Sequence, residues 1–273
     1  MEQTLRTRDG YGIAYRVDDF TDPWTTPQTL LLLHAAMGSM QRWFRWVPTL
    51  SRHFRVVRMD LRGHGGSQMP APDQPFSLDD LVVDAVQVLD AVGCETAHVV
   101  GNSAGGYVAQ QLALRHPQRV RTLALYGSTP GLKHSQAHTW IPRIQKDGLR
   151  HFLAETIADR FDADADPQLV RWFIDQAGAN DSAFITRFIG HMCTHDFMDA
   201  LHRIDCPTLI VAAGRESIGD TSAYDRMHEC IRGSKLVKYD VDVHNICDQF
   251  ADRCVDDLLR FLLPEGGRPQ PQP

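Results

Sequence analysis

Hydrophobic residues follow two periods that alternate along most of the chain. Short, nearly continuous apolar runs are typical of strands that are covered on both faces of a parallel sheet. Such runs occupy residues 29–34, 54–60, 97–101, 120–126 and 206–214. The segment between Ser77 and Gly93 instead has apolar residues at helical spacing and begins with a capping-box pattern. Strands that alternate with helices predict a parallel sheet with helices on both faces.

The two ends of this core also have recognisable patterns. Residues 4–8 and 12–17 flank the pair Asp9-Gly10, which predicts an antiparallel hairpin closed by a tight turn. The last predicted elements are a helix, a strand and a closing helix, over residues 224–231, 234–240 and 245–263. Together these elements predict the α/β class, with a mostly parallel sheet of eight strands.

The alternation stops between residues 129 and 205. Apolar pairs recur there at helical spacing, for example Phe152 with Leu153 and Phe188 with Ile189, and no strand pattern separates them. The segment predicts three or four short helices, with a linker over 162–167, inserted as a cap over the sheet. The predicted domains are a core over 1–128 and 206–264, a helical cap over 129–205 and a disordered tail over 265–273.

Composition and charge narrow the functional classes. The 273 residues are 43% hydrophobic and 23% charged, which is ordinary for a soluble globular protein. A formal charge of −6 gives no indication of nucleic-acid or membrane-surface binding. The first residues lack an apolar signal region, and the six cysteines are scattered without C-x-x-C spacing, so we expect a cytoplasmic protein with reduced thiols and no metal.

The candidate chemistry centres on Ser103, in a G-x-S-x-G pattern formed with Gly101 and Gly105. An apolar strand precedes this pattern and an amphipathic helix follows it. This context is that of a nucleophile elbow, where small residues two before and two after the serine let strand and helix approach closely. The turn would expose the Ser103 hydroxyl and direct the Ala104 N–H to the position of a developing oxyanion.

The order of elements and motifs resembles the α/β-hydrolase fold family over residues 4–263. Four features carry the resemblance: the strand ending in 34–38 with Trp43 downstream, the loop 60–67, the Ser103 elbow, and His244 before the last helix. The cap length and the phrase at 204–211 look most like the branch of 3-oxoadipate enol-lactonases and small carboxylesterases. In this family His34 and His64 would be structural and make hydrogen bonds within loops near the site.

The resemblance implies a catalytic triad. Ser103 needs a base, and His244 lies where the family's loop brings its histidine over the elbow. The family places an aspartate three residues after the glycine that ends the penultimate strand, and here that position holds Ser217. The candidates for the acid are therefore Glu216, then Asp220, then Asp242 or no acid at all.

An oxyanion hole needs two N–H donors. Ala104 would supply one, and the loop after strand 29–34 would supply the other from Ala36, with Met37 as the alternative. Ala35 stands where the family usually has glycine, so this loop is expected to shift slightly. The residues expected between core and cap are Met37, Trp43, Tyr126, Trp140, Trp172 and Met192, each of which could equally be core packing. The cap arginines that could bind a substrate carboxylate, or could simply be solvated, are Arg143, Arg171 and Arg187.

These observations favour a cofactor-free serine hydrolase that cleaves a carboxylic ester or lactone through an acyl-enzyme on Ser103. The alternatives are carbon–carbon bond hydrolysis or acyl transfer at the same site, and a ligand-binding or receptor protein on a hydrolase scaffold. Ser217 and Ala35 are the departures that raise the last alternative. The expected partner is a small-molecule substrate, and the sequence leaves a homodimer open.

Overall fold

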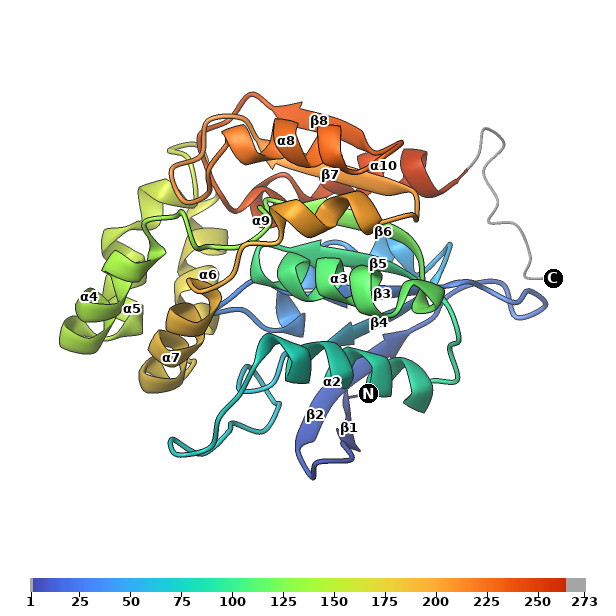
Figure 1. Cartoon of the computed structure of the whole chain (residues 1–273), viewed down its shortest axis with the longest axis horizontal. Helices are drawn as coiled ribbons and strands as arrows, with labels where there is room; N and C mark the ends of the chain where they lie inside the picture. The colour runs from blue at the N-terminus through green and yellow to red at the C-terminus, as the bar shows by residue number, and fades with distance from the viewer. Residues whose placement is uncertain (1, 264–273) are drawn as a thin grey trace.

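A computed structural model describes residues 2–263 of the chain (Figure 1). The predicted disordered tail over 265–273 lies outside the described residues. Eight strands form one sheet in the order β1-β2-β4-β3-β5-β6-β7-β8, which confirms the predicted class and strand number. The strands are β1 Glu2–Arg6, β2 Gly12–Asp18, β3 Thr29–Leu33, β4 Arg55–Met59, β5 Ala97–Asn102, β6 Val120–Tyr126, β7 Thr208–Ala213 and β8 Lys235–Tyr239.

Strand direction follows the predicted pattern. β1 pairs with β2, and β2 with β4, in antiparallel register, whereas every pair from β4 to β8 is parallel. The predicted hairpin is confirmed, with Thr7 and Tyr11 bonded across its turn. β3 is central and fully buried, and its alternate leucines pack into two separate apolar clusters, one on each face of the sheet.

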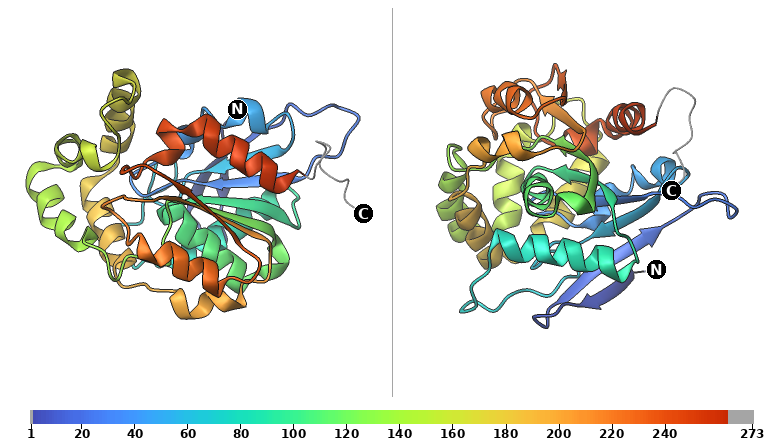
Figure 2. Two further views of the ribbon diagram at one scale, coloured as in Figure 1. Left: turned by 90° about the horizontal axis from the view of Figure 1, so that it is seen from above. Right: turned by 45° about the vertical axis from the view of Figure 1, so that its right-hand side comes forward.

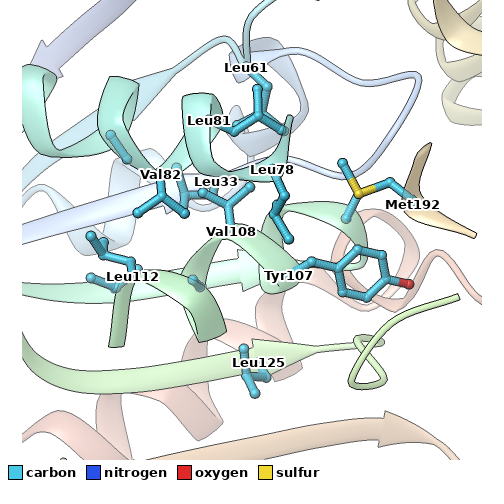
Figure 3. Close-up of a cluster of buried hydrophobic side chains, with 14 of the residues drawn as sticks. Leu33, Leu61, Leu78, Leu81, Val82, Tyr107, Val108, Leu112, Leu125 and Met192 are labelled. Atoms are coloured by element: carbon cyan, nitrogen blue, oxygen red, sulfur yellow. The ribbon is translucent and has the colours of Figure 1, made fainter. Parts of the chain in front are cut away.

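Helices cover both of these faces. α10 (Ala251–Leu262) lies on one face and α3 (Ala104–Arg115) and α8 (Ser222–Cys230) lie on the other (Figure 2). α2 (Leu78–Ala91) packs beside α3, where Leu33 and Val82 lie close together and the Tyr107 ring extends towards Met192 (Figure 3). The Ser77 hydroxyl accepts from the Asp80 N–H and the Asp80 carboxylate accepts from the Ser77 N–H, which confirms the capping box.

The predicted closing helix is divided. It consists of α9 (Ile246–Gln249) and α10, and the backbone at Phe250 leaves the helical region between them (φ −108°, ψ 37°). The prediction of one continuous helix over 245–263 was therefore wrong at its first turn. A short helix α1 (Val47–Leu50) lies between β3 and β4 in the chain.

Between β6 and β7 the chain forms helices and no strand. The helices are α4 Trp140–Asp147, α5 Leu149–Glu155, α6 Pro167–Gly178 and α7 Ser182–Met192, and they stand together at one end of the sheet (Figure 1). The predicted apolar pairs mark α5, α6 and α7, whereas α4 was not assigned from its sequence. Within residues 2–263 there is no helix with the length and hydrophobicity that a bilayer crossing requires.

The buried His98 is expected to make the stability of the fold depend on pH. His98 on β5 is 4% exposed, and its ring lies 2.9 Å from Thr122 Oγ1 and 2.7 Å from Gln28 Oε1. Burial lowers the pKa of His98 to about 4. Between pH 6.5 and about 4 the unfolded chain therefore binds a proton that the folded chain excludes.

We expect His98→Gln to weaken this pH dependence. Because the native pKa is lowered, the penalty is absent above pH 6.5 and grows as the pH falls towards 4. Between pH 7 and 5 the variant should lose about 2 kcal/mol less unfolding free energy than the wild type. Urea unfolding at both pH values measures this difference, with the exposed His138→Gln as control. Equal losses in wild type and His98→Gln would contradict the prediction.

Candidate active site

Ser103 occupies a strained turn between β5 and α3. Its backbone has a φ of 50° and a ψ of −115°, a combination that residues other than glycine rarely adopt. Met37 is the other non-glycine residue with positive φ among residues 2–263. The Ser103 N–H donates to Tyr126 O at 2.9 Å, and its carbonyl accepts from Ser128 Oγ at 2.8 Å. Bonds on both sides of the serine therefore fix the turn.

Glycines allow the surrounding backbones to meet at this turn. A Cβ on Gly101 would lie 2.5 Å from Gly106 Cα, and a Cβ on Gly105 would lie 2.2 Å from Leu33 O. Both contacts are far too short, which confirms the predicted steric need for small residues on each side of Ser103. Gly106 carries the same constraint, because its Cβ would meet Ser128 Oγ at 2.1 Å. The G-x-S-x-G pattern did not include this third glycine.

The structure brings together Ser103 and His244, which are 141 residues apart in the sequence. His244 Nε2 lies 3.0 Å from Ser103 Oγ, and His244 Nδ1 bonds to Glu216 Oε2. Nδ1 donates to the carboxylate, so Nε2 is the acceptor for the serine hydroxyl. The three side chains thus form a hydrogen-bonded Ser-His-Glu series with the geometry that nucleophile activation requires.

Glu216 is the acidic candidate that reaches the imidazole. Its side chain is fully buried after β7, and Tyr224 OH donates to its Oε1 at 2.5 Å. Asp220 instead accepts from the N–H and hydroxyl of Ser222 at the start of α8, and Asp242 pairs with Arg215 on the surface. Ser217 donates to Asp159 at 3.1 Å. The longer glutamate side chain therefore takes the place of an aspartate one position later.

Two backbone N–H groups border the space above Ser103. Ala36 and Ala104 both line the pocket beside Ser103 and His244, as does Met37. Ala104 is the first residue of α3, and neither its N–H nor that of Ala36 has a hydrogen-bond acceptor among residues 2–263. The two donors expected for an oxyanion hole are thus available at the pocket. Their role remains a prediction.

His34 and His64 support the loop that carries Ala36. His34 Nδ1 donates to Ala35 O at 2.8 Å, and its Nε2 accepts from the Leu61 N–H at 2.9 Å. Burial lowers the pKa of His34 to about 4, so the ring is neutral and both bonds can form. The His64 ring packs edge-on against His34 and Phe188, and its pKa is lowered to about 3 by the same cause.

The pocket beside Ser103 and His244 is also lined by residues of α4, α6 and α7. Met37, Trp140 and Met192 line it as predicted. Trp43 and Tyr126 do not, because they are buried on the α10 side of the sheet, where Tyr126 OH donates to Cys254 O. The prediction that Trp43 and Tyr126 line the pocket was therefore wrong. The orientation of the strand places the Tyr126 side chain on the opposite face of the sheet. Trp172 is also outside the pocket and stacks edge-on against Phe44.

The arginines at the pocket are Arg42 and Arg160, which the sequence did not indicate. Of the three proposed from the sequence, Arg143 pairs with Glu155 on the surface, and Arg171 is exposed. Arg187 donates to the carbonyls of the loop at 70–72. None of these three is among the residues that line the pocket.

Residues 2–263 contain no group of three or more His, Cys, Asp or Glu side chains placed to hold a metal ion. All six cysteines lie in this range and are free thiols. Cys247 and Cys254 are buried near α9, and burial raises the pKa of Cys247 well above its usual value.

A family model described as the α/β hydrolase fold matches residues 28–171, more than half of the chain. The chain therefore belongs to the α/β-hydrolase fold family. A hydrolase from Pseudomonas aeruginosa PA01 is similar to it with a TM-score of 0.85 and 29% identity, over 96% of this chain and 98% of that one. An enol-lactonase from Burkholderia xenovorans LB400 has a TM-score of 0.86 over 95% and 99% of the two chains, and at 22% identity it shows the fold alone.

A 2-hydroxymuconate semialdehyde hydrolase of Pseudomonas sp. (strain CF600) is 43% identical over 102 residues, which are 36% of each chain. Matches to the first three curated relatives span between 34% and 42% of each relative's length. Because these matches are partial, they do not by themselves assign the activity of those relatives to this chain.

If Glu216 orients His244, then Glu216→Gln should slow covalent labelling of Ser103 by a fluorophosphonate about 10³-fold, because the amide can favour the wrong imidazole tautomer. The labelling rate is followed by intact-protein mass spectrometry. Asp220→Asn and Asp242→Asn are the matched controls and should label within about twofold of the wild type, since neither side chain reaches the ring. Slow labelling of either control with normal labelling of Glu216→Gln would reverse the assignment.

Proposed function

We propose that the protein is a serine hydrolase that cleaves a carboxylic ester or lactone without a cofactor. The single observation that supports this best is the hydrogen-bonded series from Ser103 through His244 to Glu216 at the floor of a largely apolar pocket. A carbonyl carbon held above Ser103 Oγ would lie close to a nucleophile, a base and two free N–H donors.

In the proposed first half-reaction, Ser103 Oγ attacks the substrate carbonyl while His244 Nε2 takes the hydroxyl proton. The buried Glu216 carboxylate stabilises the imidazolium that forms. The N–H groups of Ala36 and Ala104 bind the oxyanion of the tetrahedral intermediate. His244 then protonates the leaving alkoxide oxygen, and the acyl group stays on Ser103.

Water completes the proposed cycle. His244 Nε2 deprotonates a water molecule, which attacks the acyl carbonyl, and the same N–H groups bind the second oxyanion. Collapse of this intermediate returns the proton to Ser103 Oγ and releases the acid. With a lactone, alcohol and acid leave as one molecule.

Carbon–carbon bond hydrolysis is the second candidate, and the 43% identical relative favours it. A 2-hydroxymuconate semialdehyde has no ester or amide bond, so its hydrolysis breaks a carbon–carbon bond. The same three side chains suit that reaction, with a carbanion protonated in place of the leaving alkoxide. Acyl transfer would need an acceptor alcohol in place of water.

A fluorophosphonate should add to Ser103 and to no other residue, and Ser103→Ala should abolish the adduct. Peptide mass spectrometry of the folded protein locates it. Product analysis on matched esters, lactones and β-diketones then separates the candidates, and we expect turnover of the first two, lost at least 10³-fold in Ser103→Ala. Diketone cleavage alone would select the carbon–carbon hydrolase. Tight ligand binding that is unchanged by Ser103→Ala, with no turnover, would select a binding protein.

A further inference from the structure

Arg160 is a buried cation at the wall of the pocket that contains Ser103 and His244. It follows the short helical turn Ile157–Asp159 and is 5% exposed. Its Nη1 donates to Thr156 O at 2.8 Å and to Thr156 Oγ1 at 2.7 Å. Among residues 2–263, no acceptor is bonded to its Nε or Nη2, which leaves these donors for a ligand.

The other buried arginines are neutralised by carboxylates. Arg42 pairs with Asp248, Arg58 with Asp18, and Arg62 with Asp84. Arg160 has no such ion pair among the described residues, although Asp159 is its neighbour in sequence. Burial lowers the pKa of Arg160 to about 10, so the guanidinium is still protonated at neutral pH. An unpaired charge at this depth is costly, and a bound anion would offset that cost.

Apolar walls surround this charge. The Arg160 guanidinium lies 5.7 Å from the ring centroid of Trp140 and 5.5 Å from that of Phe152. Trp140, Phe173 and Phe188 line the same pocket. Arg42 also faces the pocket, and its positive charge contributes to the lowered pKa of Arg160. Such walls reduce solvent screening, so one carboxylate would be attracted more strongly here than at the surface.

Arg160 is also tied to the loop that holds the base. The His244 N–H donates to Asp159 O at 3.1 Å, and the Asn245 N–H donates to Arg160 O at 3.1 Å. These two bonds set the position of the Arg160 backbone relative to His244. A substrate group that binds the guanidinium would therefore be placed at a fixed offset from the reacting carbonyl.

We propose that Arg160 binds a carboxylate of the substrate, and that the substrate class is an ester or lactone that also carries a free carboxylate. This proposal rests on the proposed function. Nε and Nη2 form one edge of the guanidinium, which matches a carboxylate with two parallel hydrogen bonds. Arg160 is then the residue that determines specificity for anionic over neutral substrates.

The test compares two substrates that differ in one group, monomethyl glutarate and the methyl ester of glutaramic acid. The wild type should hydrolyse the first with a kcat/KM about 10- to 100-fold higher, because a buried charge-assisted pair is lost in the amide. Arg160→Met keeps an apolar stem and should remove this preference, mostly by raising KM for the anion. The readout is the ratio of the two kcat/KM values within each variant, so a loss of activity common to both substrates does not affect it.

Arg143→Met is the matched control, since Arg143 also lies over the Phe152 ring, at 5.1 Å, but is half-exposed and paired with Glu155. It should keep the full preference. Arg160→Lys should keep part of it, because the charge remains and the planar edge is lost. Circular dichroism verifies folding, and if Arg160→Met does not fold, Arg160→Lys decides. No preference in the wild type, or an unchanged preference in Arg160→Met and Arg160→Lys, would overturn the proposal.

Binding without turnover separates this proposal from the proposed function. Monomethyl glutarate should bind the Ser103→Ala protein at least 10-fold tighter than the methyl ester of glutaramic acid in titration calorimetry, and Arg160→Met should abolish the difference. If Ser103 labels with the fluorophosphonate but the two esters bind equally, the carboxylate site is wrong and the hydrolase stands. If Ser103 does not label and monomethyl glutarate alone binds through Arg160, the hydrolase is wrong and the carboxylate site stands.

Discussion

Close contact between backbones at the Ser103 turn is the constraint on which the rest of the site depends. Helix α3 starts so near to strands β3 and β5 that Gly101, Gly105 and Gly106 have no room for a Cβ. The chain can reverse there only with Ser103 at a φ of 50°. The same turn places Ser103 and Ala104 in the lining of the pocket, where His244 Nε2 lies 3.0 Å from Ser103 Oγ. The buried sheet stabilises this local strain through its packing on both faces.

The segment between β6 and β7 does more than cover this turn. Its residues Asp159 and Arg160 accept backbone hydrogen bonds from His244 and Asn245, so His244 is held by this segment as well as by the core. Glu216 and Tyr224 hold the other ring nitrogen from the side of β7 and α8. A displacement of the turn at 157–160 would move the imidazole relative to Ser103. The position of His244 therefore depends on the same segment that shapes the pocket.

The sequence predicted what depends on local spacing. Apolar periods gave the strands and most helices, and the small residues around Ser103 gave the elbow, because each requirement acts over a few neighbouring residues. The sequence favours Glu216 over Asp220, but the distinction depends on the bond from His244 to Glu216 and on the burial of Glu216, which sequence spacing does not show. Tyr126 was misplaced because apolar content does not indicate which face of a fully buried strand a ring occupies. The sequence did not predict the burial of Arg160 at the pocket, because an arginine beside an aspartate-rich stretch is usually solvated.

Whether a buried arginine has a carboxylate partner within the chain bears on both the stability of the fold and the choice of ligand. Arg58 and Arg62 form ion pairs with aspartates in the part of the chain before α3, so folding pairs each of these charges with a carboxylate. The two arginines at the pocket differ in this respect. Arg42 forms an ion pair with Asp248, whereas Arg160 bonds only to the oxygens of Thr156 among the described residues. A buried guanidinium without a counterion lowers stability, and such a cost is typical of functional sites rather than of scaffolds. Among the described residues Arg160 therefore has no carboxylate partner, and an anionic ligand would supply one.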